Sequence, residues 1–346
     1  MKTIQLNEHQ YTILCHEILK EANRIRRIRD DEFPYPQANP STDVLNNIKD
    51  SDEEYNKLFN LKGNKKVNRL KALSEPQGKA QNDVDNVQKQ LTQNIQQRLK
   101  SQGKSIYQDM SAVDIPDATR KKLANAGLEI EIKGKTFAYG NKKLPPSTMI
   151  INLTSAFNCP AKECPLRQSV CYAGKDEKMY TNTELRNLRN EFALEQLTVK
   201  EILQLLDVYI KSAPIKIKTI RLSESGDFKS QEVVDFCEKM AQHLNAKYGI
   251  RTVCYTHQPF NFTHCSAMIV NSSLPDERIK GADRNYLVCN KVKFEKIPEG
   301  LKYNPKTNEM TFKCYCDCYK CNFCYNTKEE NGEAPNIRTN VYVQKH

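Results

Sequence analysis

Residues 218–257 read KTIRLSESGDFKSQEVVDFCEKMAQHLNAKYGIRTVCYTH, a run that predicts a strand, a helix and a second strand. The two ends, KTIRLSES (218–225) and RTVCYTH (251–257), are short and rich in β-branched residues, as strands are. The helix between them is expected to start after Ser230 as its N-cap and to end at Gly249. Two strands joined through a helix are typical of a parallel sheet.

The same pattern continues on both sides of this unit. MIINLTSA (149–156) predicts an earlier strand, and residues 181–212 predict one long or broken helix packed on the sheet. SAMIVNSS (266–273) and RNYLVCN (284–290) predict two later strands whose connections are short for full crossover helices. We therefore expect an α/β fold in which parallel strands form an incomplete, partial (β/α) barrel.

The chain divides into three regions by composition. Residues 1–130 are polar and read as helical, with amphipathic or capped segments at 10–29 and 114–127. Residues 131–290 carry the strand and helix pattern, and residues 291–346 form a Cys-rich segment. We expect these to be an N-terminal helical extension, the partial barrel and a metal-binding segment.

Composition also limits the class of protein. The 346 residues are 38% hydrophobic and 27% charged, and no apolar run approaches the roughly 20 residues that a membrane span needs. The first twenty residues show no signal-peptide pattern, so we expect a cytoplasmic protein with no membrane partner and reduced thiols. The net charge of +11 makes a nucleic-acid partner plausible, although Lys-rich solvated faces explain the charge equally well.

Three of the 13 cysteines lie in one loop after the first strand of the predicted sheet. Cys159, Cys164 and Cys171 are spaced Cys-x4-Cys-x6-Cys, and three converging thiolates leave one coordination position for a ligand from elsewhere. This favours an iron-sulfur cluster. A tetrahedral zinc site is the alternative, with a fourth ligand from a distant part of the chain. The candidates for that ligand are Cys254, Cys265, His257 and Cys289.

Five further cysteines crowd into the C-terminal segment KCYCDCYKCNFCYN (313–326). They are Cys314, Cys316, Cys318, Cys321 and Cys324. The last three have the Cys-x2-Cys-x2-Cys spacing of ferredoxin-type loops, with either of the first two as a fourth ligand, so a second cluster and a zinc site are both open. Cys237 differs, because it falls on the apolar stripe of its helix and is expected in the core.

Polar residues follow successive strands of the predicted sheet. SESGDF (223–228), YTHQ (255–258) and NSSL (271–274) join the cysteine loop at the carboxyl ends of the strands, which share one edge and build active sites in parallel α/β folds. His257 and His264 are weaker candidates for substrate contact. Glu224 and Asp227 have a plainer explanation as helix-capping residues.

A family resemblance rests on three stretches. GNKKLPPSTMIINLTSAFNCPAKECPLRQSVCYAGK (140–175), IRLSESGDF (220–228) and VCYTHQ (253–258) resemble the phage "gene product eighty-eight" family over roughly residues 137–330. That family resembles radical S-adenosylmethionine (radical SAM) proteins, in which a partial barrel carries a cluster loop after its first strand. The resemblance implies that Cys159, Cys164 and Cys171 hold a 4Fe-4S cluster that binds S-adenosylmethionine.

The resemblance also implies which residues surround the cofactor. Tyr172 would pack near the cluster, and the loop after the second strand would line the methionine end of S-adenosylmethionine. The loop residues concerned are Ser223, Glu224, Ser225, Gly226 and Asp227. The cysteine spacing departs from the Cys-x3-Cys-x2-Cys of the superfamily, which leaves cleavage of the cofactor open.

Two functional hypotheses follow. The first is an iron-sulfur enzyme of radical SAM type acting on an unknown substrate, for which nucleic acid is a candidate. The second is a zinc-stabilised, basic nucleic-acid-binding protein without catalytic activity. A third reading keeps the iron-sulfur clusters but gives them only a scaffolding role. Phosphate-binding Gly-rich loops, Gly-x-Ser-x-Gly elbows and His-Glu-x-x-His motifs do not occur in the sequence, so nucleotide hydrolase, serine hydrolase and zinc protease functions have no support.

Overall fold

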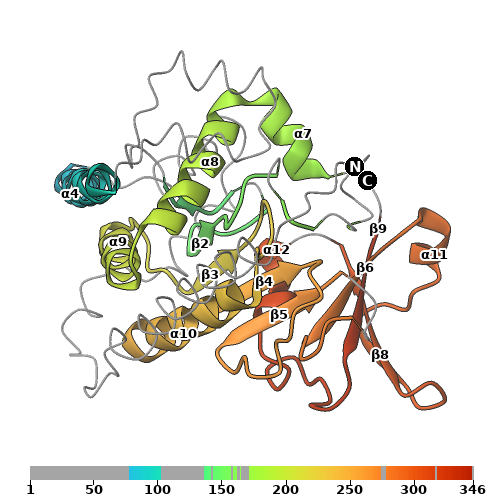
Figure 1. Cartoon of the computed structure of the whole chain (residues 1–346). Helices are drawn as coiled ribbons and strands as arrows, with labels where there is room; N and C mark the ends of the chain where they lie inside the picture. The colour runs from blue at the N-terminus through green and yellow to red at the C-terminus, as the bar shows by residue number, and fades with distance from the viewer. Residues whose placement is uncertain are drawn as a thin grey trace, which may run out of the picture.

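The structure is a computed structural model of the chain (Figure 1). It describes residues 78–102, 136–141, 143–156, 159–161, 164, 171–273, 278–315 and 318–344. The helices predicted at 10–29 and 114–127, and Cys316, lie outside these ranges. None of the helices within them is long and apolar enough to cross a membrane.

A single open sheet of nine strands organises the described part of the chain, which confirms the α/β class. Its strand order is β1-β2-β3-β4-β5-β6-β9-β8-β7, and every neighbouring pair is parallel except β1 with β2 and β7 with β8. The strands are β1 (Ala138–Tyr139), β2 (Thr148–Ile151), β3 (Thr219–Leu222), β4 (Arg251–Thr256), β5 (Met268–Ser272), β6 (Arg284–Cys289), β7 (Leu301–Asn304), β8 (Glu309–Cys314) and β9 (Thr339–Gln344). The five strands predicted from sequence are all present, as β2 to β6.

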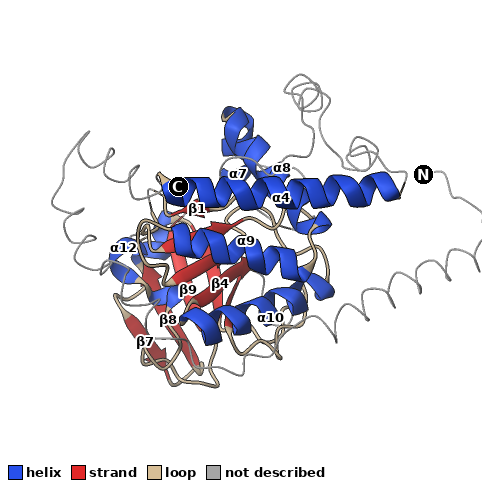
Figure 2. Cartoon of the chain, turned by 90° about the vertical axis from the view of Figure 1, so that its left-hand side faces the viewer, coloured by secondary structure: helices blue, strands red, loops and turns tan. Residues whose placement is uncertain are grey.

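Three helices cover one face of the sheet, as Figure 2 shows. They are α4 (Lys79–Ser101), α9 (Val199–Ser212) and α10 (Gln231–Tyr248). Alternate strand residues such as Ile220 and Leu222 point to this side and are fully buried in one apolar cluster with the helices. Cys237 of α10 belongs to the cluster and is completely buried, which confirms its predicted place in the core.

The region 181–212 is a broken helix, and its sequence explains the break. α8 (Thr181–Gln196) ends before Thr198, which accepts a hydrogen bond from Glu201 N while Glu201 accepts one from Thr198 N. This capping box starts α9 as a new helix. In α10, Gly249 ends the helix in the left-handed conformation as predicted, whereas the Ser230 side chain makes no capping bond.

The C-terminal segment covers the opposite face of the sheet. α12 (Cys318–Cys321) and the 3₁₀ turn η2 (Phe323–Tyr325) follow β8, and the ring of Phe323 stacks on Phe312 with centroids 3.8 Å apart. Cys314, Cys324 and Tyr325 are buried there against strand residues of β2, β4 and β5. A short helix, α11 (Lys291–Glu295), connects β6 with β7.

Arginines from three strands hold this segment in place. Arg221 of β3 donates to Tyr325 Oη at 3.2 Å, and Arg251 of β4 donates to Tyr325 O at 2.9 Å. Arg284 of β6 is completely buried and pairs with Glu333 at 2.6 Å. The segment is therefore fixed to the sheet by charge-assisted bonds as well as by apolar contact.

Candidate functional site

The loops after β2, β3 and β4 meet at the carboxyl edge of the sheet, where one buried carboxylate joins them. Asp227, only 1% exposed, accepts hydrogen bonds from Thr256 Oγ1 at 2.8 Å and from His257 N at 2.7 Å. Its own N–H donates to Thr154 Oγ1 at 3.1 Å. Burial raises the pKa of Asp227 to about 6, against the effect of these donated bonds. Through its carboxylate and its backbone N–H together, Asp227 thus fixes three successive strand ends relative to one another.

A second buried carboxylate ties the cysteine loop to the same edge. Glu177 of α7 (Tyr172–Met179) is completely buried, and both of its oxygens accept from Ala156 N, at 2.9 and 3.0 Å. Its Oε1 also accepts from Ser225 Oγ at 2.9 Å and from Asn187 Nδ2 at 2.6 Å. Ala156 precedes the cysteine loop and α7 follows it, so Glu177 draws both ends of that loop onto the β3 loop.

Asn152 completes this network from the end of β2. Its Oδ1 accepts from Ser225 N at 2.9 Å, and its Nδ2 donates to Asn187 Oδ1 at 2.9 Å. Nearby, Ser155 N donates to Glu191 Oε2 at 2.9 Å, and Lys229 pairs with the other oxygen of Glu191 at 2.7 Å. Apart from the exposed Lys229, these polar groups are buried and bonded to one another, which makes the edge a rigid platform.

Two opposite charges stand beside the platform. Glu224 accepts a hydrogen bond from Asn141 Nδ2, and the guanidinium of Arg186 in α8 lies within electrostatic range of Glu224 and Glu177. Burial lowers the pKa of Arg186, and the two carboxylates oppose that shift. The edge can therefore present both a carboxylate and a guanidinium to a ligand that carries both charges.

Three buried polar atoms at this edge find no hydrogen-bond partner among the described residues. They are Ser223 Oγ after β3, His257 Nε2 after β4 and Asn271 Oδ1 in β5. Tyr255, two residues before His257, lies opposite Asn271 in the sheet register, so the three atoms come from neighbouring strand ends. Burial lowers the pKa of His257 to about 4, so its ring is neutral at pH 7. Ser223 Oγ and His257 Nε2 can bond to a bound molecule, whereas the Asn271 side chain lies under the C-terminal segment, where its Nδ2 donates to Cys324 O at 3.3 Å.

The β3 loop approaches β2 so closely that only glycine fits at one position. Gly226 has φ +76°, and a Cβ there would meet Thr154 Oγ1 at 2.0 Å and Thr154 O at 2.4 Å. Ser223 also has a positive φ, 56°, which is uncommon for a residue with a side chain. Backbone held in such conformations clusters at binding sites.

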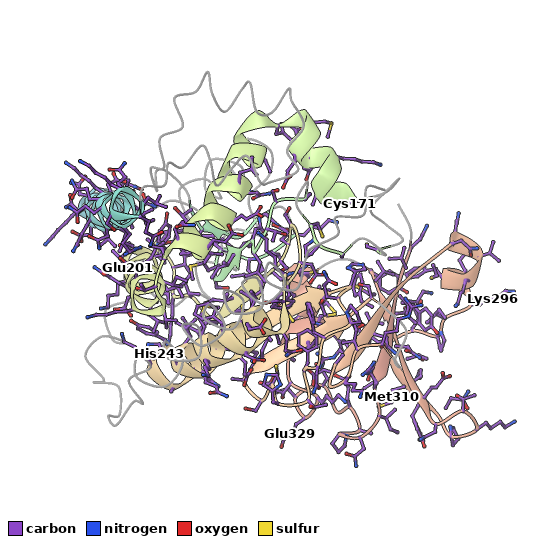
Figure 3. All side chains as sticks on the ribbon, viewed as in Figure 1. Cys171, Glu201, His243, Lys296, Met310 and Glu329 are labelled. Carbon is purple, nitrogen blue, oxygen red and sulfur yellow. The ribbon has the colours of Figure 1, made fainter. Side chains whose placement is uncertain are left out.

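The three cysteines of the loop lie between Ala156 and α7 in the chain, and all three are among the described residues. Figure 3 shows Cys171 at the start of α7, where its thiol accepts the N–H of Gly174 at 3.4 Å. Cys159 N donates to Ala156 O at 3.4 Å, and Cys164 N donates to Ala161 O at 3.1 Å, so each of these two cysteines sits in a tight turn. All three cysteines are half-buried. The side chain of Tyr172 is outside the described part.

Four of the C-terminal cysteines gather on the other face of the sheet. Cys314 and Cys324 are buried in the same apolar cluster, and Cys318 packs against it. Burial, together with the neighbouring thiols of Cys318 and Cys321, raises the pKa of Cys324 to about 11 against the opposing effects of Tyr255 and Arg284. The spacing seen in the sequence therefore corresponds to proximity in space.

Neither cysteine group forms a finished metal site. Within the described ranges, no three Cys, His, Asp or Glu side chains are close enough together to hold a metal ion. The eleven cysteines described form no disulfide with one another. The predicted ligand sets, Cys159 with Cys164 and Cys171, and the C-terminal group, remain predictions.

Sequence reasoning missed the polar side of α8 and the whole role of Glu177. Asn187, Asn190 and Glu191 recur at helical spacing and are all buried, a signal that attention to apolar positions alone passes over. It also missed Arg186, which has no motif around it. The residues 223–227 and the cysteine loop, by contrast, do share one edge as predicted.

Comparison with known proteins gives one match. The model of a family described as Gene product 88 matches residues 117–279, which supports the resemblance over the cysteine loop and the loops after β3 and β4. The C-terminal cysteines lie beyond the matched range. No curated protein and no solved structure matches the chain.

Proposed function

We propose that this chain, similar to the Gene product 88 family over its central part, is an iron-sulfur protein of radical SAM type. The observation that carries the proposal is the bonding of Glu177, which holds both ends of the cysteine loop and the Ser225 hydroxyl at one sheet edge. A cysteine loop tied to a polar, strained loop at the carboxyl edge of parallel strands is where an α/β fold builds its active site.

The residues at this edge suit the proposed cofactor. Cys159, Cys164 and Cys171 would hold the cluster, since three thiolates from one loop leave a coordination position for a ligand. Glu224 would bind the ammonium of S-adenosylmethionine and Arg186 its carboxylate, because opposite charges recognise an amino acid group. When bound, the reduced cluster supplies the electron that cleaves the sulfonium.

The remaining edge residues would face the substrate side. The Ser223 hydroxyl and the neutral ring of His257 offer hydrogen bonds that no described residue satisfies. The buried pair of Asp227 and Thr256 would hold His257 in position through its backbone. The net charge of +11 keeps a nucleic-acid-derived substrate as the leading class.

A zinc-stabilised nucleic-acid-binding protein is the second candidate. It is favoured by the C-terminal cysteines, which lie in an apolar cluster with stacked Phe312 and Phe323, as ligands of a shielded structural metal do. This metal would be zinc or a second cluster. The two candidates differ in the metal expected at the cysteine loop.

Metal analysis of anaerobically purified protein tests the proposal. Iron and sulfide in stoichiometric amounts, with broad visible absorption, support it, whereas zinc in place of iron supports the second candidate. Cys164→Ala should remove the iron of one centre, while the matched control Cys237→Ala should keep all metal because Cys237 lies in the apolar core. Reduced protein incubated with S-adenosylmethionine should release 5′-deoxyadenosine. If the protein contains iron but does not form this product, the clusters have only a structural role.

A further inference from the structure

A second pocket opens at the opposite edge of the sheet from the cysteine loop. It has a volume of about 370 Å³ and lies where β2, β3 and β4 begin. Its walls come from Ser147, Lys218 and Arg251 at the strand starts and from Asn322, Tyr325 and Asn326 of the C-terminal segment. Pockets of this size accept a ligand as large as a mononucleotide.

The lining of this pocket is cationic. Lys218 and Arg251 both line it, and none of its described lining residues is acidic. Ser147 and Asn322 also line the pocket and bring a hydroxyl and an amide group to it, whereas the Asn326 amide is already bonded to Asn331 and Arg251. The concentration of positive charge and neutral donors, without a carboxylate in the wall, favours a compact anion.

Contacts behind the wall fix the Arg251 guanidinium. Its Nη1 donates to Tyr325 O at 2.9 Å, and its Nη2 pairs at 2.8 Å with Glu330, which stands outside the lining. The strand register sets Arg251 directly opposite Thr219, the residue after Lys218. Lys218 directly precedes β3 and Arg251 begins β4, so the two cations lie at the starts of adjacent strands and line the same pocket.

We propose that this pocket binds the phosphate group of a small phosphorylated ligand of up to mononucleotide size. Phosphate presents several acceptor oxygens at once, which matches cations and donors arriving from four separate chain segments. The volume leaves room for a group attached to the phosphate, and Tyr325 contributes an aromatic wall. This site is independent of the function proposed for the other edge.

Calorimetric titration of the full-length protein tests the proposal, with inorganic phosphate, AMP, adenosine and chloride at matched ionic strength as probes. Phosphate and AMP should bind, and AMP should bind at least as tightly as phosphate. Adenosine and chloride should not. Binding of adenosine as tight as that of AMP, or displacement of phosphate by an equal concentration of chloride, would overturn the proposal.

Variants locate the binding. Lys218→Gln should weaken AMP binding by about tenfold or more, because it removes a charge-assisted bond. Lys216→Gln, two residues earlier and outside the lining, should leave it unchanged. Arg251→Lys keeps the charge but loses the paired geometry, and should weaken binding by a smaller factor. Circular dichroism establishes that each variant is folded. Equal AMP binding by the Lys218 and Lys216 variants would contradict the assignment of the binding site to this pocket.

Discussion

The Ser225 hydroxyl donates a 2.9 Å hydrogen bond to Glu177 Oε1, and this contact joins the loop after β3 to the helix that follows the cysteine loop. The same carboxylate accepts from Ala156 N at the other end of that loop. The buried Glu177 side chain thus connects its own helix, α7, to a loop residue that lies 48 positions later in the sequence.

Glu177→Gln should separate these segments. The amide replaces one acceptor oxygen by a donor and leaves a buried donor without its acceptor, which costs about 1–3 kcal/mol of unfolding free energy. If the cysteine loop holds the proposed cluster, its metal content should fall, while any metal at the C-terminal cysteines should not. Denaturant titration and metal analysis measure both effects.

Glu195→Gln is the matched control, since its ion pair with Lys229 is exposed and contributes only about 0–1 kcal/mol. Equal losses of metal in the two variants would argue against a special role for Glu177.

Asp227 and His257 should contribute opposite pH dependences to stability. The pKa of Asp227 is raised from 3.8 to about 6, so its folded state holds the proton more tightly and its contribution falls as the pH rises from about 4 to 6. The pKa of His257 is lowered from 6.5 to about 4, so its contribution rises between pH 4 and 6.5. Each shift corresponds to about 3 kcal/mol, and in the native protein the two largely cancel.

Single substitutions should reveal the pH dependence of stability that each residue contributes. Asp227→Asn should make the protein more stable as the pH rises through this window, and His257→Gln should make it less stable. Unfolding free energies measured at several pH values between 4 and 7 test this. Slopes of the same sign in the two variants would contradict it.

Gly226→Ala should destabilise the protein far more than an ordinary glycine substitution. The new Cβ would approach the Thr154 backbone oxygen to 2.4 Å, so we expect a loss of at least about 3 kcal/mol. Gly332→Ala is the control, because Gly332 has a similar φ of +68° but nothing within 4 Å of its Cβ position. It should cost only the backbone strain, about 1–2 kcal/mol. Thermal or denaturant unfolding compares them, and similar losses would mean that the loop moves to accommodate the methyl group.

Glu333→Gln should weaken the attachment of the C-terminal segment. Arg284 and Glu333 are completely buried, and breaking such a pair costs about 3–5 kcal/mol because a charge is left without its counterion. Glu330→Gln removes the half-exposed partner of Arg251 and should cost no more than about 1 kcal/mol. Denaturant unfolding measures both losses, and a smaller loss for Glu333→Gln than for Glu330→Gln would refute the buried pair as the main anchor.

Local patterns were enough to predict the central strands and α10. Residues 251–256, for example, combine β-branched positions with a preceding Gly249 that ends a helix, and both signals are local. The strand ends then followed from the rule that parallel strands share an edge, which located residues 223–227 and the cysteine loop together.

Those local patterns could not predict which strands pair with one another across long stretches of sequence. β8 and β9 read as part of a Cys-rich segment, yet β9 pairs in parallel with β6, about 50 residues earlier. The burial of Arg284 with Glu333 depends on that pairing, and neither residue stands in a motif. Glu177 was missed for the same reason, because its partners come from two separate loops and from helix α8.

The order of the strands also bears on how the sheet is assembled during folding. β9 follows β8 and is the last strand among the described residues, but it lies between β6 and β8 in the sheet. Cys318, Cys321 and Cys324 lie in the connection between β8 and β9, and the hairpin of β7 and β8 joins the rest of the sheet only through β9. Placement of the hairpin therefore depends on β9, so a substitution that prevents β9 from pairing with β6 and β8 should detach the hairpin from the sheet.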